Sequence, residues 1–330
     1  MSKERALNLV LLLLIGLMGS VSLLAGRVWL PVSDVWNGLW SADDHLASLI
    51  VWQLRMPRMV LAIEVGAALG LSGAVLQGVT RNPLAESGLL GVSAGAALGS
   101  VIAIYFGFQA HLLTAAPMLG VVGALIASVL TWTLGRGGGT IALILAGAAV
   151  TALAGAGISL ALNLAPNPYA AYEIMTWLMG SLADRSWEHV LLVSPFVLVG
   201  ALLLFLTTRA LDALSLGEAQ AQSMGVNLRQ LYLLCIFGTA LAVGASTAVT
   251  GAIGFIGLIA PHLVRPLVGY QPSRVLVPAT LAGAVLLLGA DIATRLIQSG
   301  PEMKLGVFTS LVGTPFFFWL VVRLRKNAPY

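Results

Sequence analysis

The sequence predicts an all-α, polytopic membrane protein with about ten transmembrane helices, and three observations carry that prediction. Hydrophobic residues fill 58% of the 330 positions, whereas Asp, Glu, Lys and Arg together fill only 9%, too few charges for the surface of a soluble protein. Apolar runs of about 20 residues, enough for a helix to cross the hydrocarbon layer, recur along the whole chain. Long alternating apolar and polar stretches, typical of barrel strands, are missing from the sequence. We therefore expect a single transmembrane domain over residues 1–330.

The expected spans follow from the apolar runs. They lie at residues 6–26, 59–79, 88–108, 113–134, 140–164, 189–208, 229–250, 257–269, 275–297 and 306–325. The first apolar run is about 20 residues long and exceeds a signal-peptide core of about 7 to 15, so we expect a retained span. The eighth span is irregular, because the apolar stretch 231–264 is too long for one crossing and too short for two. Glycines interrupt it, which predicts a full helix, a tight glycine turn, and a short or broken helix.

The basic residues predict the orientation in the membrane. Ten spans put both termini on one side, together with Lys3, Arg5, Arg81, Arg136, Arg209, Arg229, Arg265, Arg274, Arg323, Arg325 and Lys326. The other side receives Arg27, Arg55, Arg58, Arg185, Arg295 and Lys304. The first side is richer in Lys and Arg, and by the positive-inside rule it is cytoplasmic. The net charge of +4 comes from residues scattered at the ends of apolar runs, so we expect membrane lipid and no nucleic acid as a partner.

One polar interval stands out in the second half of the chain. Residues 214–225 lie between two apolar runs, and Gly217 and Gly225 punctuate the ends of a stretch of helix-forming residues. This pattern predicts a short helix held at the cytoplasmic membrane surface, within a segment of about residues 211–228. We expect a protein outside the membrane to dock there.

The catalytic motifs in the sequence do not predict an enzyme. Gly91-Val-Ser93-Ala-Gly95 fits the Gly-x-Ser-x-Gly pattern of serine hydrolases, with His262 as a possible base, but that pattern needs a strand–turn–helix context. Glycines spaced in this way predict close helix packing instead. The sequence has no glycine-rich loop followed by Lys-Ser or Lys-Thr, so any energy from ATP must come from a partner. The four histidines lack metal-ligand spacing, and Cys235 lies alone in an apolar run. We expect no enzyme and no metal site.

Two polar motifs near span ends allow a structural and a functional interpretation. Residues 81–86, Arg-Asn-Pro-Leu-Ala-Glu, suit a capped turn and also suit a gate at the inner mouth of a pathway. Asp291 and Arg295 are four residues apart and predict an ion pair along a helix. Arg295 also shares the outer side with Arg55 and Arg58, and three guanidinium groups could receive the carboxylates of a soluble partner.

Glu64 falls inside the second predicted span, where a carboxylate costs a few kcal/mol unless it is paired or hydrated. It either reaches the outer headgroups or lines an aqueous pathway. The pathway interpretation and the broken eighth span would also suit an ion-driven secondary transporter of a small solute, although the sequence has no evident inverted halves. Besides a secondary transporter, the sequence also allows a membrane enzyme as a further class of function.

Several motifs together resemble a known family. In chain order they are Leu54-Arg-Met-Pro-Arg58, Gly73-x-x-x-Gln77 leading to Arg81-Asn-Pro-Leu-Ala85, Leu90-Gly-Val92, Gly251-Ala-Ile-Gly-Phe-Ile-Gly-Leu-Ile-Ala-Pro-His262, Ala290-Asp291 to Arg295, and Glu302 to Gly306. Over nearly the whole chain this series resembles the FecCD permease family. The members of that family are membrane subunits of type II ABC importers for ferric siderophores, haem and cobalamin.

The resemblance implies the fold, the partners and the cargo. It implies the permease fold of ABC type II importers in the inner membrane, as a homodimer with the pathway on its two-fold axis. The implied partners are two ABC ATPase subunits, which bind ATP and Mg²⁺, and one periplasmic or extracellular substrate-binding protein. No cofactor is expected on this chain. A ferric siderophore is the first expected cargo, with haem and cobalamin next.

The resemblance also assigns residue roles. The residues implied to couple to the ATPase are Leu216, Gly217, Glu218, Ala219, Ser223, Met224 and Gly225. Those implied to dock the binding protein are Arg55, Arg58 and Arg295. Those implied to form the cytoplasmic gate are Asn82, Leu84, Thr140 and Ile141. Two residues depart from the family pattern. Glu64, the pathway candidate, stands where an apolar residue is expected, and Ile141 is bulkier than the small polar residue of the cobalamin-carrying members.

Overall fold

The computed structural model describes residues 3–26, 28–40, 45–112, 114–297 and 302–327, and within these ranges every regular element is a helix. The elements are α1 (Lys3–Leu24), α2 (Val32–Trp40), α3 (His45–Leu49), η1 (Ile50–Arg55), α4 (Met56–Thr80), η2 (Ser87–Leu90), α5 (Val92–Tyr105), η3 (Phe108–Ala110), α6 (Ala115–Gly135), α7 (Gly139–Asn163), α8 (Pro168–Leu178), α9 (Trp187–Phe205), α10 (Thr208–Leu214), α11 (Glu218–Ser223), α12 (Leu228–Thr239), η4 (Ala240–Gly244), α13 (Ala245–Thr250), α14 (Ile256–Val264), η5 (Arg265–Leu267), α15 (Pro272–Leu296) and α16 (Leu305–Asn327).

The membrane-spanning segments agree with the predicted spans. Within the described ranges, 8 helices are long and apolar enough to cross a membrane, and two shorter apolar helices, Val92–Tyr105 and Ile256–Leu267, fall at the third and eighth predicted spans. The third is shorter than predicted because its first residues form η2, after which Gly91 turns the backbone with a φ of 73°. Eight long and two short helices therefore account for the ten predicted segments.

The second spanning helix begins earlier than predicted, at Leu46 instead of residue 59. Pro57 has no backbone N–H and would be expected to start the helix. The preceding turn η1 is π-helical, however, and the N–H of Met56 bonds to the carbonyl of Val51. The wider turn carries the helix into Pro57, so Trp52 and Arg55 are helical residues and not part of a connecting loop.

The eighth predicted span is broken, as expected, but the break differs from the predicted tight turn. Residues 251–254 have no helical structure, and Phe255 takes a φ of 68° before α14 begins. Gly251 itself has a φ of 73°, and a Cβ there would lie 2.3 Å from the carbonyl oxygen of Trp177. The backbone therefore runs on as a short non-helical stretch that packs against Trp177 at Gly251, while Ala252 is exposed.

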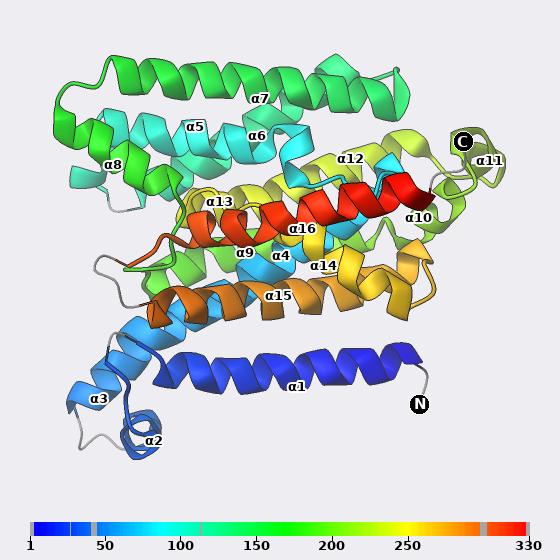
Figure 1. Ribbon diagram of the computed structural model, residues 1–330. Helices are drawn as coiled ribbons and strands as arrows, with labels where there is room; N and C mark the ends of the chain where they lie inside the picture. Colours follow the sequence, from blue (N-terminus) through cyan, green and yellow to red (C-terminus); the bar gives the residue numbers. More distant parts are fainter. Residues whose placement is uncertain (1–2, 27, 41–44, 113, 298–301, 328–330) are drawn as a thin grey trace.

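Helix α4 lies at the centre of the bundle, in contact with α15, α14 and α9 (Figure 1). A Cβ on Gly66 would lie 2.4 Å from the carbonyl oxygen of Gly283, and one on Gly70 would lie 2.2 Å from that of Ala279. These glycines let the α4 and α15 backbones touch. Most side chains of α4 are consequently buried.

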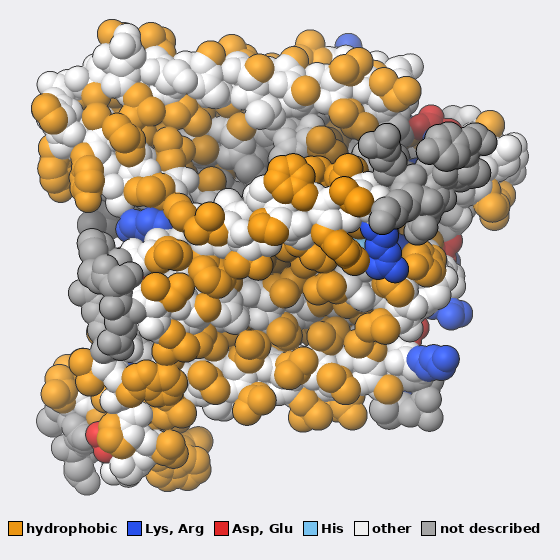
Figure 2. All heavy atoms as spheres, viewed as in Figure 1, with side chains coloured by type: hydrophobic (Ala, Val, Ile, Leu, Met, Phe, Trp, Pro, Cys, Tyr) orange, Lys and Arg blue, Asp and Glu red, His pale blue; other side chains and the backbone are white. Residues whose placement is uncertain are grey.

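The spanning helices run roughly side by side, so the molecule has two ends (Figure 1). One end carries α10, α11, the start of α1 and the end of α16, and we call it the α11 end. The opposite end carries α2, α3 and α8, and we call it the α8 end. Both termini lie at the α11 end, as the ten-span prediction requires. Hydrophobic side chains cover most of the face between the ends, while the blue basic groups lie mainly toward the ends (Figure 2).

Candidate functional site

The predicted coupling segment forms two short helices at the α11 end. Leu211 and Leu214 of α10 are fully buried and anchor the segment to the bundle. Gly217, with a φ of 112°, starts the turn into α11. Leu216 is 62% exposed and Met224 is 63% exposed. Two large apolar side chains therefore point out of the protein on either side of α11, as expected of a surface that another protein covers.

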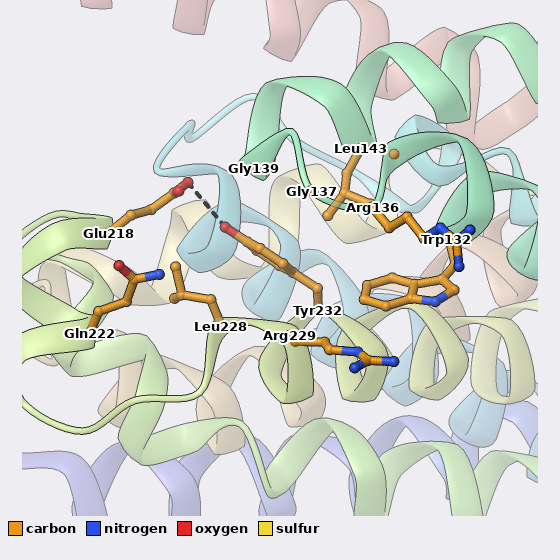
Figure 3. A pocket seen from close by; sticks show the side chains of 11 residues that line it. Trp132, Arg136, Gly137, Gly139, Leu143, Glu218, Gln222, Leu228, Arg229 and Tyr232 are labelled. Carbon is orange, nitrogen blue, oxygen red and sulfur yellow. Dashed lines mark hydrogen bonds between the residues drawn. The ribbon is translucent and has the colours of Figure 1, made fainter.

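The carboxylate of Glu218 faces its own chain (Figure 3). Its Oε1 accepts a hydrogen bond from the Thr140 hydroxyl at 2.7 Å and another from the Tyr232 hydroxyl at 3.0 Å. The hydrogen bond from Thr140 is the main cause that lowers the pKa of Glu218 below its ordinary value of 4.5. The ionised carboxylate thus joins α11 to the first turn of α7 and to α12.

Sequence reasoning assigned Glu218 and Thr140 to two separate sites, the coupling segment and the gate. The structure brings them into direct contact, and it adds Tyr232, which the sequence did not suggest. No signal in the sequence could have paired them, because Glu218 lies 78 residues from Thr140 and the bond depends on how α7 packs.

A cavity of about 580 Å³ opens beside this contact, between the end of α6, the start of α7, α11 and α12. Figure 3 shows Trp132 and Arg136 toward one side of it and Gln222 toward the other. Glu218 is the sole acidic residue among the described residues that line it. Arg136 and Arg229 also line it, so its lining has more basic than acidic side chains.

The predicted gate loop follows α4 at the same end. Oδ1 of Asn82 accepts a hydrogen bond from the N–H of Leu84 at 2.9 Å, which is the capped turn that the sequence allowed. Leu84 packs on an apolar cluster built around Leu258, Ile259 and Leu320. Ile141, in contrast, is 73% exposed. Leu84 is therefore held by α14 and α16, whereas Ile141 is free to meet another surface. Their role as a gate stays a prediction.

Glu86 ends the gate loop and differs from Glu218 in its environment. Burial raises the pKa of its carboxyl above the ordinary value of 4.5, although a hydrogen bond from the backbone of Phe255 opposes the rise. The loop between α4 and η2 is thus attached to the break before α14.

The three arginines predicted to dock the binding protein lie together at the α8 end. Asp291 Oδ2 pairs with Arg295 at 2.7 Å, which confirms the predicted ion pair. Asp291 Oδ1 pairs with Arg58 at 2.8 Å, and Arg58 also pairs with Glu302. The sequence did not predict these last two contacts, because they join α4, α15 and the segment before α16.

Arg55 and Arg295 also hold the end of α1. Arg55 donates to the carbonyl of Leu23 at 2.5 Å, and Arg295 donates to those of Ser22 and Ala25 at 2.9 and 2.8 Å. Arg55 is 9% exposed and Arg295 is 7% exposed. These guanidinium groups already have partners within the chain, so a docking protein would meet them as a fixed cluster. Docking itself stays a prediction.

Glu64 lies between α4 and α9. Its Oε1 accepts a hydrogen bond from the Ser194 hydroxyl at 2.7 Å, while its Oε2 is buried and has no partner in the structure. Ser194 supplies the pairing that a carboxylate inside a span needs, and this contact was not predicted from the sequence. Whether Glu64 lines a pathway stays a prediction.

Comparison with known proteins identifies relatives over the whole chain. A model of the FecCD transport family matches residues 11–323. The chain is 40% identical over 325 residues to the hemin transport system permease protein HmuU of Yersinia pestis, across 97% of this chain and 95% of HmuU. It is 37% identical over 326 residues to the vitamin B12 import system permease protein BtuC of Klebsiella pneumoniae subsp. pneumoniae, across 98% and 95% of the two chains.

A solved structure described as an inward-facing conformation of a metal-chelate type ABC transporter matches with a TM-score of 0.86 and 33% identity, over 97% of this chain and 99% of that one. The 8 apolar spans of the described residues, together with relatives that are bacterial permeases, indicate a multi-pass inner-membrane permease. The chain belongs to the FecCD transport family. It is accordingly a permease subunit of an ABC importer and not an enzyme, which confirms the resemblance and the fold predicted from the sequence.

Proposed function

We propose that two copies of this chain form the membrane pathway of an importer for a metal chelate, which a substrate-binding protein delivers and two ATPase subunits drive. The observation that carries this proposal is the contact between Glu218 and Thr140, at 2.7 Å. It joins the exposed helix α11 to α7, so that a protein that moves α11 also moves the start of a spanning helix. ATP and Mg²⁺ bind the ATPase in this proposal, and this chain binds no cofactor.

The pathway lies between α7 and α16 in the proposed homodimer. Ile141, Leu145 and Leu153 of α7 and Leu311 and Phe318 of α16 are exposed apolar side chains. Figure 2 shows a hollow in the surface between these two helices. A second copy facing the hollow would close it into a largely apolar channel. Such a wall binds cargo weakly, and weak binding suits transport because a strong site would trap the cargo.

The α11 end faces the cytoplasm in this proposal, with both termini, and the α8 end faces the binding protein. The excess of Lys and Arg predicted for the first side supports this orientation. ATP binding by the ATPases would shift α11, and through Glu218 the start of α7, and so change which end of the channel is open. No bond of the cargo is made or broken.

The names of two relatives support one class of cargo in this proposal. HmuU and BtuC are named for hemin and vitamin B12, both of which are metal-bearing tetrapyrrole macrocycles. We therefore place a tetrapyrrole chelate, with haem first, ahead of the ferric siderophore that the sequence alone favoured. An apolar channel suits a large planar ring.

Uptake into proteoliposomes tests the proposal. The permease, its ATPase and its binding protein are reconstituted, and haem, cobalamin and a ferric siderophore are offered in turn. We expect uptake of haem that requires ATP hydrolysis. Uptake that follows an ion gradient and persists without hydrolysis would overturn the importer mechanism, and uptake of the siderophore alone would overturn the cargo.

A further inference from the structure

A second cavity, of about 490 Å³, opens at the α11 end and shares no lining residue with the cavity beside Glu218. We call it the arginine cavity, because Arg81, Arg265 and Arg323 line it together with His262. Arg81 begins the gate loop, Arg265 follows α14, and Arg323 belongs to α16. The cavity therefore lies where the gate loop meets two spanning segments.

The charged residues that line this cavity are all basic. Its described lining residues include three arginines and no Asp or Glu. The three ion pairs found in the described part of the chain involve Arg58 and Arg295 at the α8 end. Arg81 lies near enough to Glu218 for an electrostatic interaction, but the two form no ion pair. An anionic group in the cavity would thus meet guanidinium groups that have no carboxylate partner.

Two of the guanidinium groups are held in place without losing their charge. Arg265 donates to the side-chain oxygen of Gln77, and Gln77 is itself buried and donates to the carbonyl of Ala85 at 3.3 Å. Arg323 lies over the ring of Trp319, 5.1 Å from its centroid. The partners of both guanidinium groups are uncharged. Both groups therefore keep their positive charge available for an anion.

The surroundings favour a lipid over a soluble anion. Val275 and Leu320 add apolar wall to the cavity. Leu263 and Leu267, which precede and follow Arg265 in the chain, are exposed apolar side chains. Trp319 and Tyr270 are also exposed, and aromatic residues of this kind are typical of the headgroup level. A headgroup in the cavity could therefore keep its acyl chains along the exposed apolar side chains of α14 and η5.

We propose that the arginine cavity binds the phosphate of an anionic phospholipid headgroup. Basic pockets between spanning helices are a recognised form of lipid site. The bound lipid would connect the gate loop through Arg81 to α14 and α16, and it would stabilise the arrangement of the loop seen here. This ligand is distinct from the cargo, so its binding is measured without transport.

Native mass spectrometry of the full-length chain in detergent tests the site. The chain is titrated with dioleoylphosphatidylglycerol and, separately, with dioleoylphosphatidylcholine, which has the same tails and no net charge. We expect tighter retention of the anionic lipid, and a loss of about fivefold in its affinity for Arg323→Gln, since a basic residue near the surface contributes about that much. Arg323→Lys, which keeps the charge, should lose less.

Arg274→Gln is the matched control, because Arg274 is an exposed arginine at the same end that does not line the cavity. It should leave lipid retention unchanged. Arg265→Gln provides a second variant at the cavity, and its melting temperature separates a folding defect from a binding defect. Equal retention of the two lipids, or equal loss in the control, would overturn the proposal. So would inorganic phosphate alone that displaces the lipid at millimolar concentration, because the site would then belong to a soluble anion.

Discussion

Thr140 and Glu218 form the contact on which the proposed coupling depends, and the hydroxyl of Thr140 can be removed with little change of shape. In Thr140→Val the carboxylate keeps Tyr232 and loses its shortest hydrogen bond. We expect ATP hydrolysis to continue while uptake per ATP falls about threefold or more, the scale of one hydrogen bond to a charged group at a partly exposed site. Reconstituted transporter, with both rates measured on one sample, gives this ratio.

Thr133→Val is the control for this prediction. Thr133 is an exposed threonine on α6, and its hydroxyl bonds to the carbonyl of Leu130 in its own helix. The control should keep the wild-type ratio. An unchanged ratio in Thr140→Val would show that the force from α11 reaches the channel by another route.

Asp291 is the residue whose loss should cost the most stability. It is fully buried and pairs with both Arg58 and Arg295. Asp291→Asn removes the counter-charge of Arg295 and leaves Arg58 with Glu302 alone, and breaking a buried ion pair costs about 3 to 5 kcal/mol. We expect a clear drop in the melting temperature of the detergent-purified protein. Asp184→Asn is a suitable comparison, because Asp184 is exposed at a φ of 58° that Asn also tolerates. Equal melting temperatures for the two variants would contradict the prediction.

At the scale of the element, the attachment of α11 should depend on pH. The folded-state pKa of Glu218 is lowered, so its contribution to stability is fully present above its ordinary value of 4.5 and is lost as the pH falls through the lowered pKa. The difference in melting temperature between wild type and Glu218→Gln should therefore be present at neutral pH and close under acidic conditions.

The same comparison in a Thr140→Val background serves as the control, because it lacks the hydrogen bond that does most to lower the pKa. There the difference should be smaller and should vary less with pH. A difference that stays constant from neutral to acidic pH would mean that the Glu218 carboxylate does not attach α11 to α7.

The elements themselves were predictable to differing degrees. Long apolar runs fixed the spanning helices, because a segment in lipid must satisfy its own backbone hydrogen bonds. The predicted start of the second span was wrong, because a π-helical turn precedes Pro57 and continues the helix through it. The break at residues 251–254 was expected from its glycines, but its non-helical form depends on packing against Trp177 and Gly180.

At the scale of the whole molecule, the proposed homodimer places α7 of one copy near α7 or α16 of the other. Cys235 is the single cysteine of the chain and is buried, so a Cys235→Ala background carrying Ile141→Cys tests the contact. We expect a cross-linked dimer in membranes treated with a short bifunctional thiol reagent. Leu13→Cys on α1, equally exposed on the outside of the bundle, should remain monomeric. Cross-linking through Leu13 alone would place the dimer interface elsewhere.

The sequence by itself determined the class of protein, the number and order of the spans, the exposed helix α11 and the Asp291–Arg295 pair. These features depend on composition, on the length of apolar runs and on spacing within one helix, which are all local properties. Only the tertiary structure decided that Glu218 faces Thr140, that Ser194 pairs with Glu64 and that three arginines share a cavity at the α11 end. Those contacts join residues from separate helices, and their geometry follows from how closely the glycine faces let the helices pack.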